Sequence, residues 1–337
     1  MNIQEALNKV IDKRDLTKDE MVSIMIQIME GQVESSQLGA FLTALRMKGE
    51  SISEIVGAAR VMRNKAERLK LTADYIVDTC GTGGDGADTF NISTAAAFVV
   101  AGSGITVAKH GNRAVSSRSG SADVLKCLGV NIEADKAIVE KCIDEVGIGF
   151  LFAPLMHRAM KHAAGVRKEL GIRTIFNLLG PLTNPAGAHA QVVGLYDPSR
   201  LEQIANVLKQ LGSRHAFVVH GCDGLDEITL TSDTRICELV KGEIKEYLVN
   251  PDDFGLQTCS PEDLTGGSPE ENAEILKLIL LGEKGPKRDI VLMNSSVAIV
   301  AGGRADDLEE ATRIACQAID NGSAMKKLDD LCRVSQS

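Results

Sequence analysis

The alternation that begins after Leu71 constrains the fold of this chain most. Short runs rich in β-branched residues end at glycine-rich turns, and stretches with helical spacing follow them. This pattern is typical of βα units whose strands form a mainly parallel sheet. The expected strands cover residues 75–78, 105–108, 191–195, 216–220 and 237–240. One helix is expected over residues 154–170, opened by Pro154 and closed by Gly171.

The chain before this alternation has a different pattern. Residues 4–70 carry apolar side chains at helical spacing and show no strand-like alternation, which predicts several short helices. Thr17 with Glu20, and Ser51 with Glu54, have the spacing of capping boxes. Residues 307–331 predict one or two amphipathic helices. At 337 residues the chain is about long enough for two domains.

Composition excludes several classes of protein. The N-terminus has no signal pattern and no run approaches the roughly 18 apolar residues of a membrane span, so we expect a cytoplasmic protein with no membrane partner. Eight scattered cysteines without a Cys-x-x-Cys pair predict neither a zinc site nor a disulfide framework. A net charge of −9 and 3% aromatic residues argue against a nucleic-acid surface.

A glycine-rich loop follows the first expected strand. Its sequence, from Gly81 to Gly86, fits the spacing Gly-x-Gly-x-x-Gly of dinucleotide sites. Such a site requires an acidic residue at the end of the second strand, where this chain has Lys109. The glycines therefore indicate an anion site of another kind, because their backbone amides can approach phosphate closely.

The residues after this loop strengthen the case for a polyanionic ligand. Residues 89–122 contain no Asp or Glu, where the chain average predicts roughly four or five. Asn91 to Thr94 lead directly into an alanine-rich helical run, which places free N–H groups at a helix start. Two anion sites predict a ligand with two phosphate groups. The alternative is that Ser93 or Thr94 only caps a helix and that the glycines only form a turn.

An acidic pair lies further along the chain. Asp226 and Glu227 offer the few carboxylates that Mg²⁺ prefers, and Ser93 adds a hydroxyl. The alternative for the segment Asp223 to Glu227 is an exposed acidic turn. Cys80 beside the glycine loop suggests a nucleophile, but no histidine motif supports that role.

Taken together, these segments resemble the anthranilate phosphoribosyltransferase family. The resemblance covers residues 80–230 and lies in five blocks, in the family's order: 81–85 with 91–94, 109–113, 167–171, 174–185, and 220–227. We see no departure at the motif positions. The pyrimidine nucleoside phosphorylases share this architecture and are the alternative, and relatives of the fold that bind nucleic acid are a third class.

The resemblance implies a small all-helical N-terminal domain, residues 1–70 joined by helices from about 154–185. It implies a larger α/β domain with a mainly parallel sheet over residues 71–337, and a homodimer. The implied reaction transfers the phosphoribosyl group of 5-phosphoribosyl 1-diphosphate to the amine of anthranilate, with Mg²⁺, on the route to tryptophan.

The resemblance also assigns roles to residues. No acid or base is implied; Lys109, Asn112 and Arg167 position groups and stabilise charge. Arg167 is the expected partner of the anthranilate carboxylate, because a guanidinium can hold it bidentately. On one predicted helix, His157 shares a face with Arg167. The metal ligands are Ser93, Asp226 and Glu227. The implied anthranilate site consists of Gly81, His110, Asn112, His157, Arg167 and Pro181. The implied phosphoribosyl-diphosphate site consists of Gly81, Thr82, Gly83, Gly84, Asp85, Thr89, Asn91, Ser93, Thr94, Lys109 and Ser121.

Overall fold

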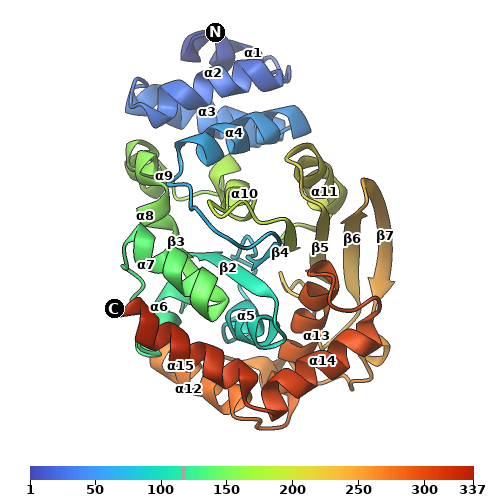
Figure 1. Cartoon of the computed structure of the whole chain (residues 1–337). Coiled ribbons are helices and arrows are strands. Elements are labelled where there is room, and N and C mark those ends of the chain that lie inside the picture. The colour runs from blue at the N-terminus through green and yellow to red at the C-terminus, as the bar shows by residue number, and fades with distance from the viewer. Residues whose placement is uncertain (115–117) are drawn as a thin grey trace.

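The computed structural model describes residues 1–114 and 118–337. A helical unit lies above a central sheet, and a second layer of helices lies below it (Figure 1). The chain starts in the helical unit and ends in the lower layer. Within the described ranges, no helix combines the length and apolar character needed to cross a bilayer.

Four helices form the N-terminal part of the helical unit: α1 (Ile3–Ile11), α2 (Lys18–Met29), α3 (Ser35–Lys48) and α4 (Ile52–Lys65). Both predicted capping boxes are confirmed, at Thr17 with Glu20 and at Ser51 with Glu54. Glu54 is fully buried, accepts the N–H of Leu16 (2.9 Å) and pairs with the Lys48 ammonium (2.9 Å). These contacts fix the start of α4 against the chain that precedes α2.

The central sheet has seven strands in the order β3-β2-β1-β4-β5-β6-β7. The first five run parallel, and β6 and β7 pair antiparallel at one edge. The fold class is therefore confirmed: a helical N-terminal part and a larger α/β part with a mainly parallel sheet. The strands are β1 (Ile76–Thr79), β2 (Thr106–Gly111), β3 (Ile148–Phe152), β4 (Ala190–Gly194), β5 (His215–Gly221), β6 (Thr234–Val240) and β7 (Glu243–Val249).

Both faces of the sheet are covered by helices. Successive residues of a strand point to opposite faces, so Val192 of β4 packs into the core below the sheet and Val193 into the core above it. The lower core includes α5 (Ile92–Gly102) and α13 (Pro286–Ala301). The upper core joins α1 to α4 with α10 (Ile175–Leu182) and α11 (Leu201–Gln210).

Two of the seven strands, β3 and β7, are absent from the five strands that the sequence predicts. β3 is a short apolar run that follows a π-helical turn (Cys142–Val146). The sequence of such a run fits a buried helix as well as a strand, so periodicity alone does not identify it as a strand. β7 lies at the sheet edge with mostly exposed side chains, so little burial marks its sequence.

The single helix predicted over residues 154–170 is wrong. The segment forms α8 (Ala153–Met156), a 3-10 turn (Arg158–Met160) and α9 (Lys161–Leu170), and it ends at Gly171 as expected. His157 has φ −121° and ψ 57°, outside the helical region, and the Met156 carbonyl accepts the N–H of Glu67 (3.0 Å). A contact with a distant segment thus replaces helical pairing at this point. His157 and Arg167 therefore do not share a face of one helix.

The remaining helices surround the sheet. The amphipathic pattern predicted over residues 307–331 is confirmed as two helices, α14 (Leu308–Asp320) and α15 (Ser323–Ser335). The others are α6 (Ser121–Cys127), α7 (Lys136–Lys141) and α12 (Pro269–Leu280).

Candidate active site

The candidate site lies where the order of strands reverses. The chain leaves β1 for α5 and then β2 on one side of β1, whereas β4 lies on the other side. In an open parallel sheet, such a reversal leaves a crevice outside the carboxyl ends of the two strands. A pocket at this position is lined by residues that include Thr79 at the end of β1, Gly194 at the end of β4, and Ser93.

The glycine loop crosses this crevice between β1 and α5. Gly83 and Gly84 have φ of +65° and +83°, values that side chains rarely adopt. The N–H and hydroxyl of Thr82 both donate to the Gly194 carbonyl (2.9 and 3.1 Å), which ties the start of the loop to β4. The N–H of Gly83 donates to Asp226 Oδ2 (2.6 Å). One backbone amide of the loop therefore already binds a carboxylate oxygen.

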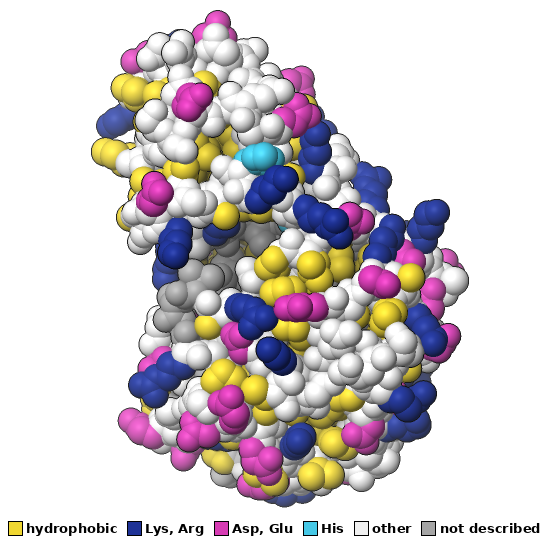
Figure 2. Space-filling view, turned by 90° about the vertical axis from the view of Figure 1, so that its left-hand side faces the viewer, with side chains coloured by type: hydrophobic (Ala, Val, Ile, Leu, Met, Phe, Trp, Pro, Cys, Tyr) yellow, Lys and Arg dark blue, Asp and Glu magenta, His cyan; other side chains and the backbone are white. Residues whose placement is uncertain are grey.

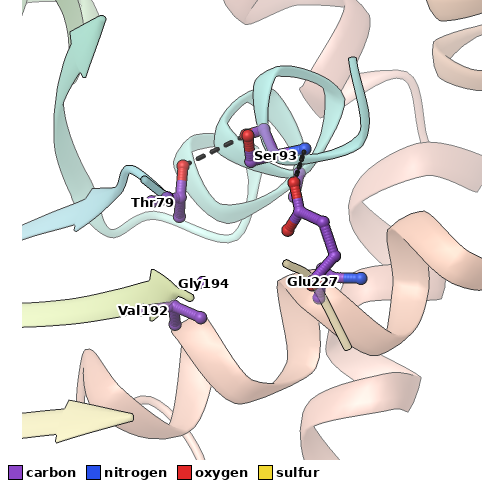
Figure 3. A pocket seen from close by; sticks show the side chains of 8 residues that line it. Thr79, Ser93, Val192, Gly194 and Glu227 are labelled. Carbon is purple, nitrogen blue, oxygen red and sulfur yellow. Dashed lines mark hydrogen bonds between the residues drawn. The ribbon is translucent and has the colours of Figure 1, made fainter. Parts of the chain in front are cut away.

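The start of α5 repeats this arrangement. Asn91 is its N-cap and makes no capping bond with its side chain, and neither Ser93 nor Thr94 is the cap. The N–H of Ser93 donates to Glu227 Oε1 (3.2 Å), a contact that Figure 3 shows beside the bond from the Thr79 hydroxyl to the Ser93 carbonyl (3.1 Å). The Gly83 amide thus binds Asp226, and the Ser93 amide binds Glu227.

Asp226 is buried and Glu227 is half-buried, so the alternative of an exposed turn does not hold for the pair itself, although Asp223 before it is exposed and lies in a turn. Asp226 is 9% exposed, and burial together with the carboxylates of Glu227 and Asp85 raises its pKa well above the ordinary value. Burial raises the pKa of Glu227 to about 7, although the charge of Lys109 opposes the shift. On α13, the Asn294 side chain holds both backbone groups of Ile228 (3.0 and 2.8 Å), which fixes the segment that carries the pair.

These oxygens fit a magnesium ion. The neighbouring carboxylates of buried Asp226 and half-buried Glu227 repel each other, and a divalent cation would offset that repulsion. The Ser93 hydroxyl, which the Lys109 ammonium approaches at 3.3 Å, adds a third hard oxygen. Within residues 1–114 and 118–337, no three His, Cys, Asp or Glu side chains group as a complete metal site.

Lys109 lies next to the same groups. It comes from the end of β2, is 4% exposed, and donates to the Thr79 carbonyl (2.6 Å). Its ammonium is therefore held by backbone and hydroxyl oxygens, beside the start of α5. From this position beside Ser93, the Lys109 ammonium can neutralise the charge of a phosphate group bound at the start of α5.

A second group of predicted residues lies toward α10. The His110 Nδ1 contacts the Gly180 carbonyl (3.0 Å), and the rings of His110 and His157 meet edge to face with centroids 5.2 Å apart. Burial lowers the pKa of His110 to about 3 and that of His157 to about 4, so both rings are neutral at pH 7. Both Nε2 atoms are buried and lack a hydrogen-bond partner in the described part of the chain.

Arg167 and Pro181 belong to the helices near this group. The Arg167 guanidinium lies 5.2 Å from the centre of the Phe176 ring, and burial lowers its pKa. Pro181 lies inside α10, and its carbonyl accepts the Gln191 side chain (2.7 Å). The helical unit therefore contributes a cation, Arg167, and an apolar residue, Pro181.

Other predicted residues have partners outside the acidic pair. The Asn112 side chain accepts the N–H of Arg113 (2.8 Å), and the Ser121 hydroxyl donates to the Asn112 carbonyl (3.3 Å). Thr89 forms an isolated β-bridge with Thr265. The Thr94 hydroxyl is buried with no partner among the described residues.

Asp85 and Asn91 complete the predicted set. Asp85 Oδ2 accepts the N–H of Asp226 (3.4 Å), which links the far end of the glycine loop to the acidic pair. Asn91 accepts the Asn272 side chain (3.1 Å) and donates to the Ser119 carbonyl (3.2 Å), so it fixes the turn before α5.

Two arginines near the site form solvent-exposed ion pairs, and one cysteine has a shifted pKa. Arg113 pairs with Asp123 (3.4 Å) and Arg118 with Asp88 (3.5 Å). Burial and nearby carboxylates raise the pKa of the Cys80 thiol, so the thiol stays protonated. A nucleophilic role for Cys80 therefore has no physical support here.

Sequence reasoning missed residues that shape the site. Asp78 is fully buried, accepts the N–H of His110 (3.1 Å) and binds the Asn184 side chain (2.8 Å). Arg173 donates to the Gly84 carbonyl at the glycine loop. Asn184 falls within a segment that carries the family resemblance, whereas Arg173 falls between two such segments and no spacing rule marks it.

Comparison with known proteins gives a consistent family. Two family models match, the helical bundle domain of the glycosyl transferase family over residues 4–66 and its a/b domain over residues 73–325. A relative from Acetivibrio thermocellus, named anthranilate phosphoribosyltransferase, is 53% identical over 99% of this chain and 97% of its own length.

Two solved structures agree. The anthranilate phosphoribosyltransferase from Thermus thermophilus is 43% identical with a TM-score of 0.94, and covers 98% of this chain and 99% of its own. The second is the anthranilate phosphoribosyltransferase from Saccharomyces cerevisiae in complex with PRPP and Mg. It is 29% identical with a TM-score of 0.92, and the match covers 99% of this chain and 98% of its own. Since the fold, both family models and the full-length relatives coincide, this chain belongs to the glycosyl transferase family and, within it, to the anthranilate phosphoribosyltransferases.

Proposed function

We propose that the protein transfers the phosphoribosyl group of 5-phosphoribosyl 1-diphosphate (PRPP) to the amine of anthranilate, giving N-(5-phosphoribosyl)anthranilate and diphosphate, in tryptophan biosynthesis. The observation that carries this proposal is the pairing of the Gly83 and Ser93 amides with the Asp226 and Glu227 carboxylates, beside the buried Lys109. The names of the full-length relatives supply the substrates.

The donor sugar is proposed to bind at the glycine loop. The amides of Gly83 and Ser93 are the anion donors, and Lys109 supplies a positive charge next to them. Asp226 and Glu227, with the Ser93 hydroxyl, would hold Mg²⁺, whose charge neutralises the diphosphate when it is bound. Both amides bind carboxylates in the present structure, so we infer that the carboxylates release the amides when the metal and the sugar bind together.

The reaction requires stabilised charge and an aligned amine. Breaking the bond between the anomeric carbon and diphosphate leaves negative charge on the leaving group, which Lys109 and the loop amides stabilise. The amine of anthranilate is neutral at pH 7, so no strong base is required. His110 and His157 fit that requirement, because their lowered pKa values keep them neutral and their unpartnered Nε2 atoms offer uncharged contacts.

The acceptor is proposed to bind between the glycine loop and α10. Arg167 would hold the anthranilate carboxylate, with its guanidinium already shielded from water and oriented by the Phe176 ring. Gly81, His110, Asn112, His157 and Pro181 are the proposed neighbours of the aromatic ring. This arrangement places the amine toward the donor sugar and the carboxylate toward the helical unit.

One assay tests the proposal. Purified protein is mixed with PRPP, Mg²⁺ and anthranilate, and the loss of anthranilate fluorescence is followed; we expect a loss that requires all three components. A pyrimidine nucleoside phosphorylase would instead release free base from thymidine or uridine in phosphate buffer. Absence of both activities, with retention of a labelled oligonucleotide in a binding assay, would support the third class.

Several features remain predictions. These are the homodimer, the cytoplasmic location, the lack of a nucleic-acid partner, and the division at residue 70 with helices from about 154–185 joined to the first part.

A further inference from the structure

Arg173 lies at the edge of the glycine loop, in the short connection between α9 and α10. Its guanidinium donates to the Gly84 carbonyl, and its central carbon lies 3.8 Å from the centre of the Tyr196 ring. This stacking fixes the plane of the guanidinium and directs its N–H groups. The contact is close, because a Cβ atom added to Gly84 would lie 3.0 Å from Arg173 Nη2. Arg173 and Gly84 are therefore fitted to each other.

The glycine loop is held from two sides. On the β4 side, Thr82 donates twice to the Gly194 carbonyl, and the N–H of Tyr196 donates to the Thr82 hydroxyl (3.3 Å). On the other side, Arg173 holds Gly84 while it rests on the side chain of the same Tyr196. Gly83, whose amide binds Asp226, lies between these two attachments.

Arg173 also connects the two halves of the crevice. The next residue, Thr174, begins α10, the helix whose Gly180 carbonyl contacts His110 and which contains Pro181. The connection joins α9 to α10, and both helices pack into the core of the helical unit. Figure 2 shows this unit above a hollow bordered by Lys and Arg side chains. A contact from this connection to Gly84 sets the glycine loop relative to the acceptor side.

We propose that Arg173 is a positioning residue for the donor sugar. Its guanidinium, held flat against Tyr196, fixes the Gly84 carbonyl and thereby orients the loop amides that receive PRPP. This inference rests on the proposed function. The role assigned is positioning through the Gly84 carbonyl, and the variants below separate it from a direct contact with phosphate.

The test measures steady-state kinetics and PRPP binding by calorimetry in Mg²⁺. Arg173→Met keeps the length of the side chain and removes the donor, and we expect the KM and Kd for PRPP to rise about 10-fold, the size of one charged hydrogen bond. The KM for anthranilate stays within about twofold, since Arg167 is untouched. Tyr196→Leu reproduces the PRPP effect, and Tyr196→Phe, which keeps the ring, restores wild-type values. The double variant Arg173→Met with Tyr196→Leu should raise the Kd for PRPP little more than either single variant, because each change alone already removes the stacked guanidinium that holds Gly84.

Arg214→Met is the matched control. Arg214 also lies over a tyrosine, Tyr75, with 5.9 Å between its guanidinium carbon and the ring centre, but it precedes β5 at the sheet end opposite the glycine loop. We expect unchanged PRPP binding in this variant, and an increase as large as that of Arg173→Met would overturn the inference.

Two further results would also reject it. One is an Arg173→Met variant with wild-type PRPP binding. The other is an Arg173→Lys variant with wild-type binding while Tyr196→Leu has no effect, because charge alone would then act, directly on phosphate. The wild-type protein is assayed first, so that failure of the transferase reaction itself is distinguished from failure of the role of Arg173.

Discussion

Burial shifts the titratable groups of the two proposed binding sides of the crevice in opposite directions. On the proposed donor side, burial raises the pKa values of Asp226 and Glu227; nearby carboxylates add to both shifts, whereas the charge of Lys109 opposes the shift of Glu227. On the acceptor side, His110 and His157 are buried as neutral rings, and burial lowers their pKa values. In the proposed function, the donor side therefore needs a cation to offset its carboxylates, whereas the acceptor side needs none for a flat, mostly uncharged ligand with one carboxylate.

The largest effect is expected from removing the donor-side charges. Asp226→Asn with Glu227→Gln should lower kcat/KM for PRPP in Mg²⁺ by about 100-fold or more, because the metal contributes several kcal/mol of charge stabilisation. In EDTA the same variant should bind PRPP at least as tightly as wild type, since the amides of Gly83 and Ser93 no longer face carboxylates. Initial rates against Mg²⁺ and calorimetry in EDTA measure both quantities.

This reversal of sign distinguishes a metal site from a structural pair. If the two carboxylates only held the loop in shape, the double variant would bind PRPP more weakly in both buffers. An unchanged Mg²⁺ titration would remove the pair from the metal site. Asp123→Asn combined with Glu133→Gln, which removes the two acids paired with Arg113, serves as a control with equal loss of charge.

The acceptor side gives the next largest effect. Arg167→Ala should raise the KM for anthranilate by roughly 10- to 100-fold, the size of about 1.5 to 3 kcal/mol for a charged hydrogen bond. The KM for PRPP should change little, because Arg167 lies over Phe176 and not at the glycine loop. Arg158→Ala, in the same segment but paired with Glu67 (3.8 Å), is the matched control. Unchanged anthranilate kinetics in Arg167→Ala would remove Arg167 from the site.

The sequence predicts more of the donor side than of the acceptor side. The glycine loop follows β1, Ser93 lies at the start of the next helix, α5, and Lys109 lies in β2, so local pattern and topology place them together. Asp226 contacts Gly83 from 143 positions away, which spacing cannot show and only the family resemblance indicated. On the acceptor side, the break at His157 depends on a bond between Met156 and Glu67, a long-range contact that helical periodicity does not contain.

The smallest effects are shifts of stability with pH, and they should have opposite signs on the two sides. Glu227 in the folded chain keeps its proton up to about pH 7, whereas an unfolded glutamate loses it near 4.5. The folded state then binds more protons between these values, so the free energy of unfolding falls as pH rises from 4.5 to 7. Glu227→Gln removes this loss. Its melting temperature relative to metal-free wild type should rise by about 2 °C between pH 5 and pH 7.5.

The imidazoles reverse the direction. His157 has a folded pKa of about 4 against an ordinary value of 6.5, so the unfolded chain binds more protons between these values and stability falls as pH drops below 6.5. His157→Gln removes this loss. Its melting temperature relative to wild type should therefore rise by about 2 °C from pH 7.5 to pH 5, opposite to Glu227→Gln. The two windows overlap between pH 4.5 and 6.5, so the wild-type curve alone conceals both effects and only the variant differences separate them. Differences that change in the same direction with pH would show that burial does not act oppositely on the two sides of the crevice.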